Sequence, residues 1–134
     1  MQSGELLFTN AGHVPPLWYR AAERKWLIIS HSTPYAKEVA DLPLGVIAGT
    51  PYTQTAIQLS PGDLLVLYTD GISESRGADG RQLGSDRLAS LASTVPVELP
   101  DKAGEALFSC VEMFRGTMPA ADDETMIVLR RNTS

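Results

Sequence analysis

An almost continuous apolar run near the middle of the chain limits the fold more than any other feature. Residues 63–69 read DLLVLYT and follow the turn-forming sequence Ser60-Pro61-Gly62. The run has the length of a strand and is far shorter than the roughly 18 residues of a membrane-spanning helix. Because almost every position in it is apolar, we predict a strand that is covered on both faces and lies inside its sheet.

Shorter runs rich in aromatic, β-branched and leucine residues surround this strand and are separated by Pro, Gly, Asn and Ser. Such runs are typical of antiparallel strands joined by tight connections. We therefore expect further strands at residues 5–9, 17–19, 25–29, 52–59 and 125–130.

The apolar spacing becomes helical after residue 80. Apolar side chains between residues 88 and 95 recur at helical spacing behind Ser85, which we expect to be the N-cap. A second helix is predicted to open at Pro100 and to close at Gly116. The order of antiparallel strands, two helices and a final strand predicts an α+β fold with the helices packed on an antiparallel sheet.

The composition favours one folded unit and excludes several classes of protein. Of the 134 residues, 43% are hydrophobic and 20% are charged, which excludes a mainly disordered chain. The net charge of -5 argues against sequence-independent binding to nucleic acid or to a membrane. The single cysteine, Cys110, fits a reducing compartment such as the cytoplasm, and its place on the apolar side of a helix favours a core role.

Acidic residues occur where two of the predicted strands end or begin. Asp70 follows the strand at 63–69, and Asp122 and Asp123 precede the strand at 125–130. If these strands are antiparallel neighbours, the carboxylates lie at one edge of the sheet. Mg²⁺ and Mn²⁺ prefer such oxygen ligands, so the pattern indicates a candidate metal site.

The residue after Asp70 allows two interpretations. Gly71 would let the backbone turn sharply and would leave room beside the carboxylate. The simpler alternative is that Asp70-Gly71 is an ordinary turn, like Asp79-Gly80, and that Asp122 caps a loop.

Four sequence segments together carry a family resemblance that extends over nearly the whole chain. They are residues 10–16 (NAGHVPP), 42–46 (LPLGV), 59–63 (LSPGD) continuing to 68–74 (YTDGISE), and 122–125 (DDET). In this order they resemble the SpoIIE/RsbU-like branch of the bacterial PPM-type, metal-dependent serine/threonine phosphatases. The resemblance implies a β-sandwich flanked by helices, with two or more Mn²⁺ or Mg²⁺ ions at one end.

The resemblance also implies roles for individual residues. Asp70 and Asp122 match metal ligands of the family, and Asp123 and Gly71 are expected beside them or as alternative ligands. No side chain is expected to be the nucleophile, because a metal-activated water attacks phosphorus in this family.

The two histidines are explained more simply by local structure than by a role at the site. Asn10 and His13 could belong to a loop at the site, although a rigid structural turn is the simpler explanation. His31 is expected in an exposed loop.

The motif order departs from the family pattern in one respect. Family members carry an earlier Asp followed by a Gly-His-Gly segment, and this chain has no such segment. The resemblance thus implies that residues 1–134 form the C-terminal part of the domain, without its N-terminal half. The chain is then a fragment, a piece that assembles with another chain, or an inactive relative.

The implied activity is dephosphorylation of a phosphoserine or phosphothreonine regulatory protein, such as an anti-anti-sigma factor. The alternative is a half-domain that binds such a partner without turnover. We expect this chain alone to be inactive, because metal ligands of the first half are missing. We also expect self-association or strand exchange, because half a sandwich exposes apolar surface and unpaired strand edges.

Overall fold

The computed structural model describes residues 4–29 and 42–132, so the predicted loop position of His31 lies outside the described residues. The elements in chain order are β1 (Glu5–Thr9), β2 (Leu17–Arg20), β3 (Lys25–Ile28), β4 (Gln54–Gln58), β5 (Leu64–Tyr68), α1 (Asp70–Ser73), α2 (Gly84–Ala92), α3 (Pro100–Arg115) and β6 (Met126–Arg130). All six predicted strands and both predicted helices are present, and α1 is an element that the sequence pattern did not predict.

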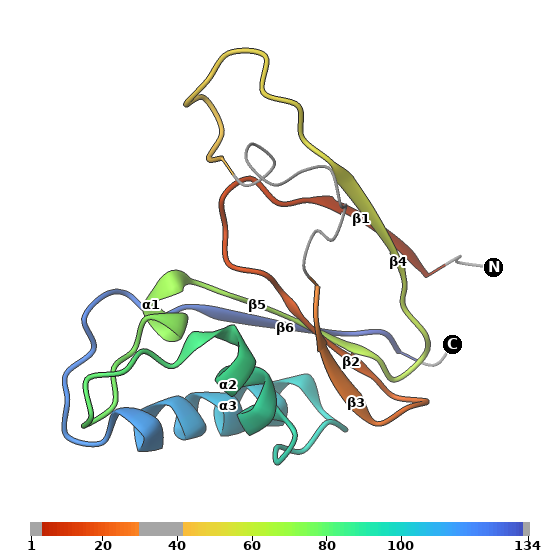
Figure 1. Ribbon diagram of the computed structural model, residues 1–134. Coiled ribbons are helices and arrows are strands. Elements are labelled where there is room, and N and C mark those ends of the chain that lie inside the picture. Colours follow the sequence, from red (N-terminus) through yellow and green to blue (C-terminus); the bar gives the residue numbers. More distant parts are fainter. Residues whose placement is uncertain (1–3, 30–41, 133–134) are drawn as a thin grey trace.

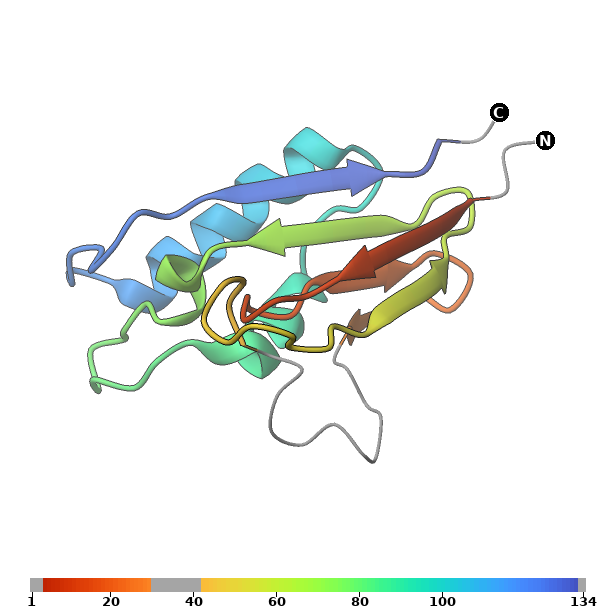
Figure 2. The ribbon, with the colours of Figure 1, turned by 90° about the horizontal axis from the view of Figure 1, so that it is seen from above.

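The elements form three layers (Figure 1). The middle layer is a four-stranded sheet in the order β3-β2-β5-β6, and all neighbouring strands in it are antiparallel. Helices α2 and α3 lie on one face of this sheet, and the two-stranded β1-β4 sheet lies on the other (Figure 2). The predicted α+β architecture is therefore confirmed.

Strand β5 lies inside the sheet, as predicted, because it pairs with both β2 and β6. Val66 and Tyr68 belong to the main core, together with side chains of α2 and α3. The other face is covered less completely: Leu65 is buried, but Leu67 is 36% exposed. The prediction of cover on both faces was therefore only partly correct, because the β1-β4 sheet does not close over the end of β5.

Helix α3 has the end signals that its sequence predicts. Pro100 lies in the first turn, Arg115 lies in the last turn, and Gly116 follows with a φ of 62°. Its Ala103, Leu107 and Val111 are fully buried against the sheet layer. Cys110 is a free thiol that packs against the core, which agrees with its predicted role.

The predicted N-cap of the preceding helix was wrong. Helix α2 begins at Gly84, and Leu83 stands at the N-cap position with helical dihedral angles and no side-chain cap. Leu83 is 3% exposed, so burial of its side chain fixes the start of the helix. Ser85 lies within the first turn, where its Oγ accepts a hydrogen bond of 2.8 Å from the Tyr68 hydroxyl. Burial raises the pKa of that hydroxyl.

A buried carboxylate at the start of β5 joins strand β2 to two turns. Asp63 is 2% exposed and accepts hydrogen bonds from the indole Nε1 of Trp18 at 3.1 Å, from the backbone N of Ala21 at 2.8 Å and from the backbone N of Ser60 at 2.9 Å. It thereby connects the start of β5 to β2 and to the turn that follows β2.

In the described part of the chain, no helix is long and apolar enough to cross a membrane.

Candidate functional site

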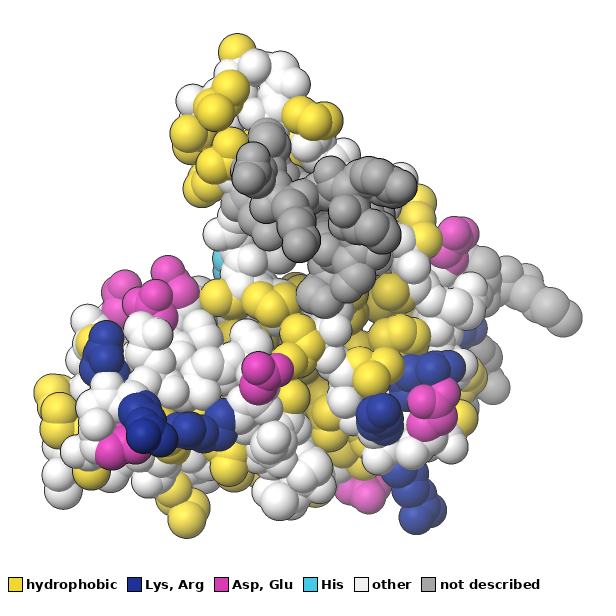
Figure 3. Space-filling model, viewed as in Figure 1, with side chains coloured by type: hydrophobic (Ala, Val, Ile, Leu, Met, Phe, Trp, Pro, Cys, Tyr) yellow, Lys and Arg dark blue, Asp and Glu magenta, His cyan; other side chains and the backbone are white. Residues whose placement is uncertain are grey.

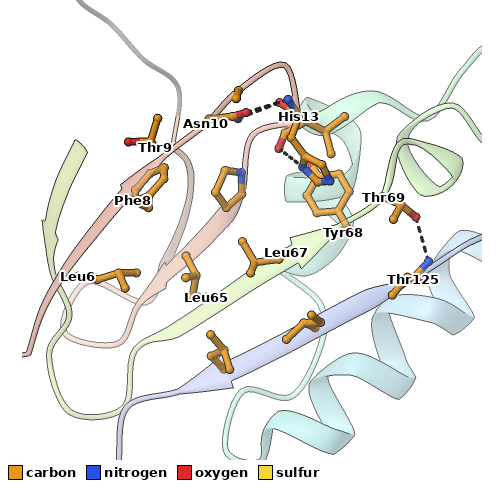
Figure 4. Close-up of a pocket in the computed structure, with 15 residues that line it drawn as sticks. Leu6, Phe8, Thr9, Asn10, His13, Leu65, Leu67, Tyr68, Thr69 and Thr125 are labelled. Carbon is orange, nitrogen blue, oxygen red and sulfur yellow. Dashed lines mark hydrogen bonds between the residues drawn. The ribbon is translucent and has the colours of Figure 1, made fainter. Parts of the chain in front are cut away.

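The predicted acidic positions lie at one end of the β5-β6 pair. The antiparallel register runs from Leu64 opposite Arg130 to Tyr68 opposite Met126. Pairing continues one residue further, because the backbone N of Thr69 donates to the carbonyl of Thr125 at 3.0 Å and the Thr125 N donates to Thr69 Oγ1 at 3.0 Å (Figure 4). Asp70 therefore leaves the sheet beside the segment that enters β6, as the antiparallel arrangement predicted.

Gly71 is required for a close approach of two backbones. A Cβ added at Gly71 would lie 2.4 Å from the carbonyl oxygen of Asp123. Gly71 has no positive φ and lies in the first turn of α1, so the predicted sharp turn is absent. The space that the missing side chain leaves is filled by the backbone of residues 122–123, so α1 packs closely against them.

The two Asp-Gly dipeptides of the chain have different structures. Asp79-Gly80 is a turn, in which Gly80 has a φ of 75° and Asp79 Oδ1 accepts a 3.0 Å bond from the backbone N of Arg81. Asp70 instead opens a helix, so the alternative of an ordinary turn at Asp70-Gly71 was wrong. The alternative that Asp122 caps a loop is partly confirmed, because Asp122 Oδ1 accepts a 2.7 Å bond from the backbone N of Asp123.

The three aspartates are exposed and belong to an acidic surface. Asp70, Asp122 and Asp123 all face solvent, and acidic side chains gather around α1 on the face drawn in Figure 3. Exposed carboxylates suit a hard cation that keeps several of its waters. Within residues 4–29 and 42–132, however, no group of three or more His, Cys, Asp and Glu side chains is arranged to hold a metal ion. The aspartates therefore fit Mg²⁺ or Mn²⁺ in donor chemistry but supply only part of a ligand shell.

A partly buried ion pair joins the end of α3 to the residue that follows these aspartates, and no sequence pattern predicted it. Arg115 Nη1 donates to Glu124 Oε1, and the two side chains are only 13% and 12% exposed. Ser75 Oγ lies 2.8 Å from the same carboxylate oxygen and 3.0 Å from the carbonyl oxygen of Gly71. The signal in the sequence was Glu124, an acidic residue directly after the two aspartates.

The loop that carries Asn10 and His13 is a closed turn. Asn10 Oδ1 accepts from the backbone N of His13 at 2.8 Å, and Asn10 Nδ2 donates to the His13 carbonyl at 2.8 Å. The exposed His13 ring lies near Tyr68 at the rim of a cavity, and Thr69 and Thr125 line the same cavity (Figure 4). The structural interpretation of this turn is thus correct, and the turn also brings His13 toward the end of the sheet that carries Asp70.

The cavity occupies about 480 Å³ between the β1-β4 sheet and the four-stranded sheet. Its lining is mostly apolar and includes Leu6, Phe8, Leu65, Leu67, Ile127 and Leu129. Ile127 and Leu129 are each about half exposed, at 52% and 50%. The two sheets therefore leave an apolar face of β5 and β6 open.

Comparison with known proteins finds similarity to bacterial phosphatases. The family model described as stage II sporulation protein E, SpoIIE, matches residues 1–132. The phosphoserine phosphatase RsbU of Bacillus subtilis is 27% identical over 138 residues, which cover 98% of this chain and 36% of RsbU. The chain thus spans little more than a third of that relative.

Solved phosphatase structures share the fold. The SpoIIE phosphatase domain from Bacillus subtilis superposes with a TM-score of 0.74 in a manganese-presoaked crystal and 0.73 in a crystal form without domain swapping, at 20% and 23% identity. These matches cover 99% of this chain and 53% and 54% of those chains. The RsbU and RsbW domains of Rv1364c from Mycobacterium tuberculosis match with a TM-score of 0.70 and 26% identity, over 98% of this chain and 33% of that one.

Proposed function

Because the chain belongs to the SpoIIE family, we propose that residues 1–134 are the C-terminal part of a PPM-type serine/threonine phosphatase domain and contribute two of its metal-binding carboxylates. The observation that carries this proposal is the antiparallel β5-β6 pair, which brings Asp70 and Asp122 to one end of the sheet. The close packing of Gly71 against Asp123 supports it, because the two acidic segments have no intervening side chain at that point.

The residues of this site would have different roles. Asp70 and Asp122 would hold the cation through carboxylate oxygens, and Asp123 would act beside them as a support or an alternative ligand. When bound, Mn²⁺ or Mg²⁺ would acidify a water for attack on phosphorus and neutralise the phosphoryl oxygens. Asn10 fixes the turn that keeps His13 near the same end of the sheet.

The proposed substrate is a phosphoserine or phosphothreonine side chain of a regulatory protein. The relative RsbU is a phosphoserine phosphatase, which supports this class of substrate. Within it, a phosphorylated anti-anti-sigma protein in the cytoplasm is the partner we propose from the family resemblance.

A second function is partner binding without turnover. The observation that favours it is the partial ligand set, because the described residues hold no group of three or more metal-binding side chains. Such a half-domain would still present the loop of Asp122 and Asp123 to a partner.

Metal-dependent hydrolysis distinguishes the two functions. We expect the gene product at its natural length to hydrolyse p-nitrophenyl phosphate and a phosphoserine protein with Mn²⁺, to lose the activity with a chelator, and to regain it when Mn²⁺ is added back. Residues 1–134 alone should have little activity, because they carry only part of the ligand shell. Turnover that persists in chelator would contradict the metal proposal, and binding of the phosphoprotein without any hydrolysis would favour the second function.

We also propose that residues 1–134 alone self-associate through the open face of β5 and β6. In the described residues β6 pairs only with β5, and Ile127 and Leu129 leave half of their side chains exposed. An unpaired edge beside exposed apolar side chains favours strand pairing between chains.

Light scattering tests the association. We expect a dimer or larger species for residues 1–134, and Ile127→Lys should weaken the association at least about tenfold, because a charge would be buried in an apolar contact. Met113→Lys is the matched control, since Met113 is 81% exposed on α3 and away from this face. A monomeric wild-type chain at high concentration would contradict the prediction.

A further inference from the structure

We propose that the partly buried Arg115–Glu124 ion pair, together with Ser75, is a positioning device that sets the affinity of the candidate metal site. It would do so by fixing the loop of Asp122 and Asp123 against the start of α1. This inference rests on the proposed function, because it concerns the same aspartates.

The ion pair closes the loop that carries the aspartates. Residues 116–123 are all exposed, and they connect the end of α3 to the segment before β6. Arg115 is the last residue of α3, and Glu124 is the first residue after this exposed stretch. The bond between the two side chains therefore joins both ends of the loop at its base.

Contacts on both sides of residue 123 then fix the loop against α1 and β5. Glu124 Oε1 lies 2.8 Å from Ser75 Oγ, which lies 3.0 Å from the Gly71 carbonyl. Thr69 Oγ1 donates to the Asp123 carbonyl at 3.1 Å, and the backbone N of Thr125 donates to Thr69 Oγ1. Residues 123–125 are thus fixed one after another. Among the described residues, the Asp122 side chain bonds to the next residue of its own loop.

Burial distinguishes this ion pair from an ordinary surface pair. Lys102 and Glu105 on the same helix form a pair whose side chains are 55% and 66% exposed, and such pairs contribute little. Arg115 and Glu124 are only 13% and 12% exposed, and Ser75 is 2% exposed. An ion pair removed from water often stabilises no more than apolar side chains of the same size would, whereas loss of one partner leaves the other charge unpaired and is strongly destabilising. In some proteins such a pair serves to specify one geometry. Specification of the loop geometry is therefore the role that fits this pair.

An electrostatic role and a positioning role of the ion pair predict opposite effects on Mn²⁺ binding when Arg115 is replaced. If the pair acted only through its electric field, loss of the positive Arg115 would strengthen Mn²⁺ binding, and loss of the negative Glu124 would weaken it. If the pair positions the loop, loss of either partner weakens binding. Arg115→Met is therefore the decisive variant, and Glu124→Gln is its companion.

The experiment is a Mn²⁺ titration of the gene product at its natural length, followed by the EPR signal of the free ion. We expect Arg115→Met and Glu124→Gln each to raise the dissociation constant for Mn²⁺ about 10- to 100-fold, the range known for residues that orient metal ligands. Turnover should recover as the Mn²⁺ concentration is raised, because the ligands themselves are unchanged. Glu105→Gln, which breaks the exposed pair on α3, should leave the dissociation constant unchanged.

Tighter or unchanged Mn²⁺ binding in Arg115→Met would overturn the inference. If that variant does not fold, Ser75→Ala replaces it, because it removes one buried hydroxyl and keeps both charges. A raised dissociation constant in Ser75→Ala would support the inference, and an unchanged one would overturn it.

The variant Asp70→Asn separates failure of the positioning role from failure of the proposed metal site. Lost binding in Asp70→Asn with normal binding in Arg115→Met would refute only the positioning role, whereas normal binding in Asp70→Asn would refute the metal site itself.

Discussion

Asp70→Asn is expected to lower the Mn²⁺-dependent turnover of the gene product by about 100-fold or more, which corresponds to at least ~2.7 kcal/mol of transition-state stabilisation. The substitution keeps the size of the side chain and removes the negative charge that a hard cation requires. Asp70 is exposed at the start of α1, and among the described residues its Oδ1 accepts a 3.1 Å bond from the neighbouring backbone N of Gly71. The substitution should therefore change the candidate site and leave the fold intact.

The matched control is the other Asp-Gly dipeptide. Asp79→Asn removes the same charge from a turn in which the carboxylate accepts a bond from the backbone N of Arg81. An asparagine oxygen can accept that bond, so turnover should stay within about twofold of the wild type. Equal turnover in Asp70→Asn, Asp79→Asn and the wild type would contradict the assignment of Asp70 as a metal ligand.

The largest effect on stability is expected at a residue far from this site. Asp63→Ala should lower the free energy of unfolding by about 3 kcal/mol or more, because the buried carboxylate accepts three hydrogen bonds and each of the three donors would lose its partner. The loss would loosen the turn that begins β5 and the turn that follows β2, since Asp63 is the group that joins them.

Urea unfolding measures this effect. Asp63→Asn should give an intermediate loss, because its amide keeps one acceptor oxygen but turns an NH₂ group toward a donor. Glu112→Ala, at an exposed position of α3, is the control and should change the free energy of unfolding by no more than about 0.5 kcal/mol. A change of similar size in Asp63→Ala and Glu112→Ala would show that the three bonds contribute nothing to stability.

Local patterns predicted the strands and the two longer helices well. The runs at β1 to β6 combine apolar or β-branched residues with flanking Pro, Gly and Asn, and α3 has a proline at its start and a glycine after its end. Helix α1 was not predicted because its four residues are too few to show a helical period. The exposure of Leu67 was not predicted either, because it depends on how the β1-β4 sheet, formed by segments distant in the chain, is placed over β5.

The candidate site was predictable only where sheet geometry determines it. Antiparallel pairing of two neighbouring strands sufficed to place Asp70 near Asp122. The supporting contacts join residues far apart in the chain: Ser75 and Glu124 are separated by 49 positions, and Trp18 and Asp63 by 45. No local spacing marks such pairs, since packing of whole elements creates them.

Binding of Mn²⁺ to the gene product is the measurement that tests the central claim most directly. The EPR signal of the free ion, followed during titration, reports bound Mn²⁺ without any assumption about the substrate. We predict that the wild type and Asp79→Asn bind the ion equally and that Asp70→Asn and Asp122→Asn bind it at least about tenfold more weakly. Equal binding by all four proteins would contradict the claim that Asp70 and Asp122 form part of a metal centre.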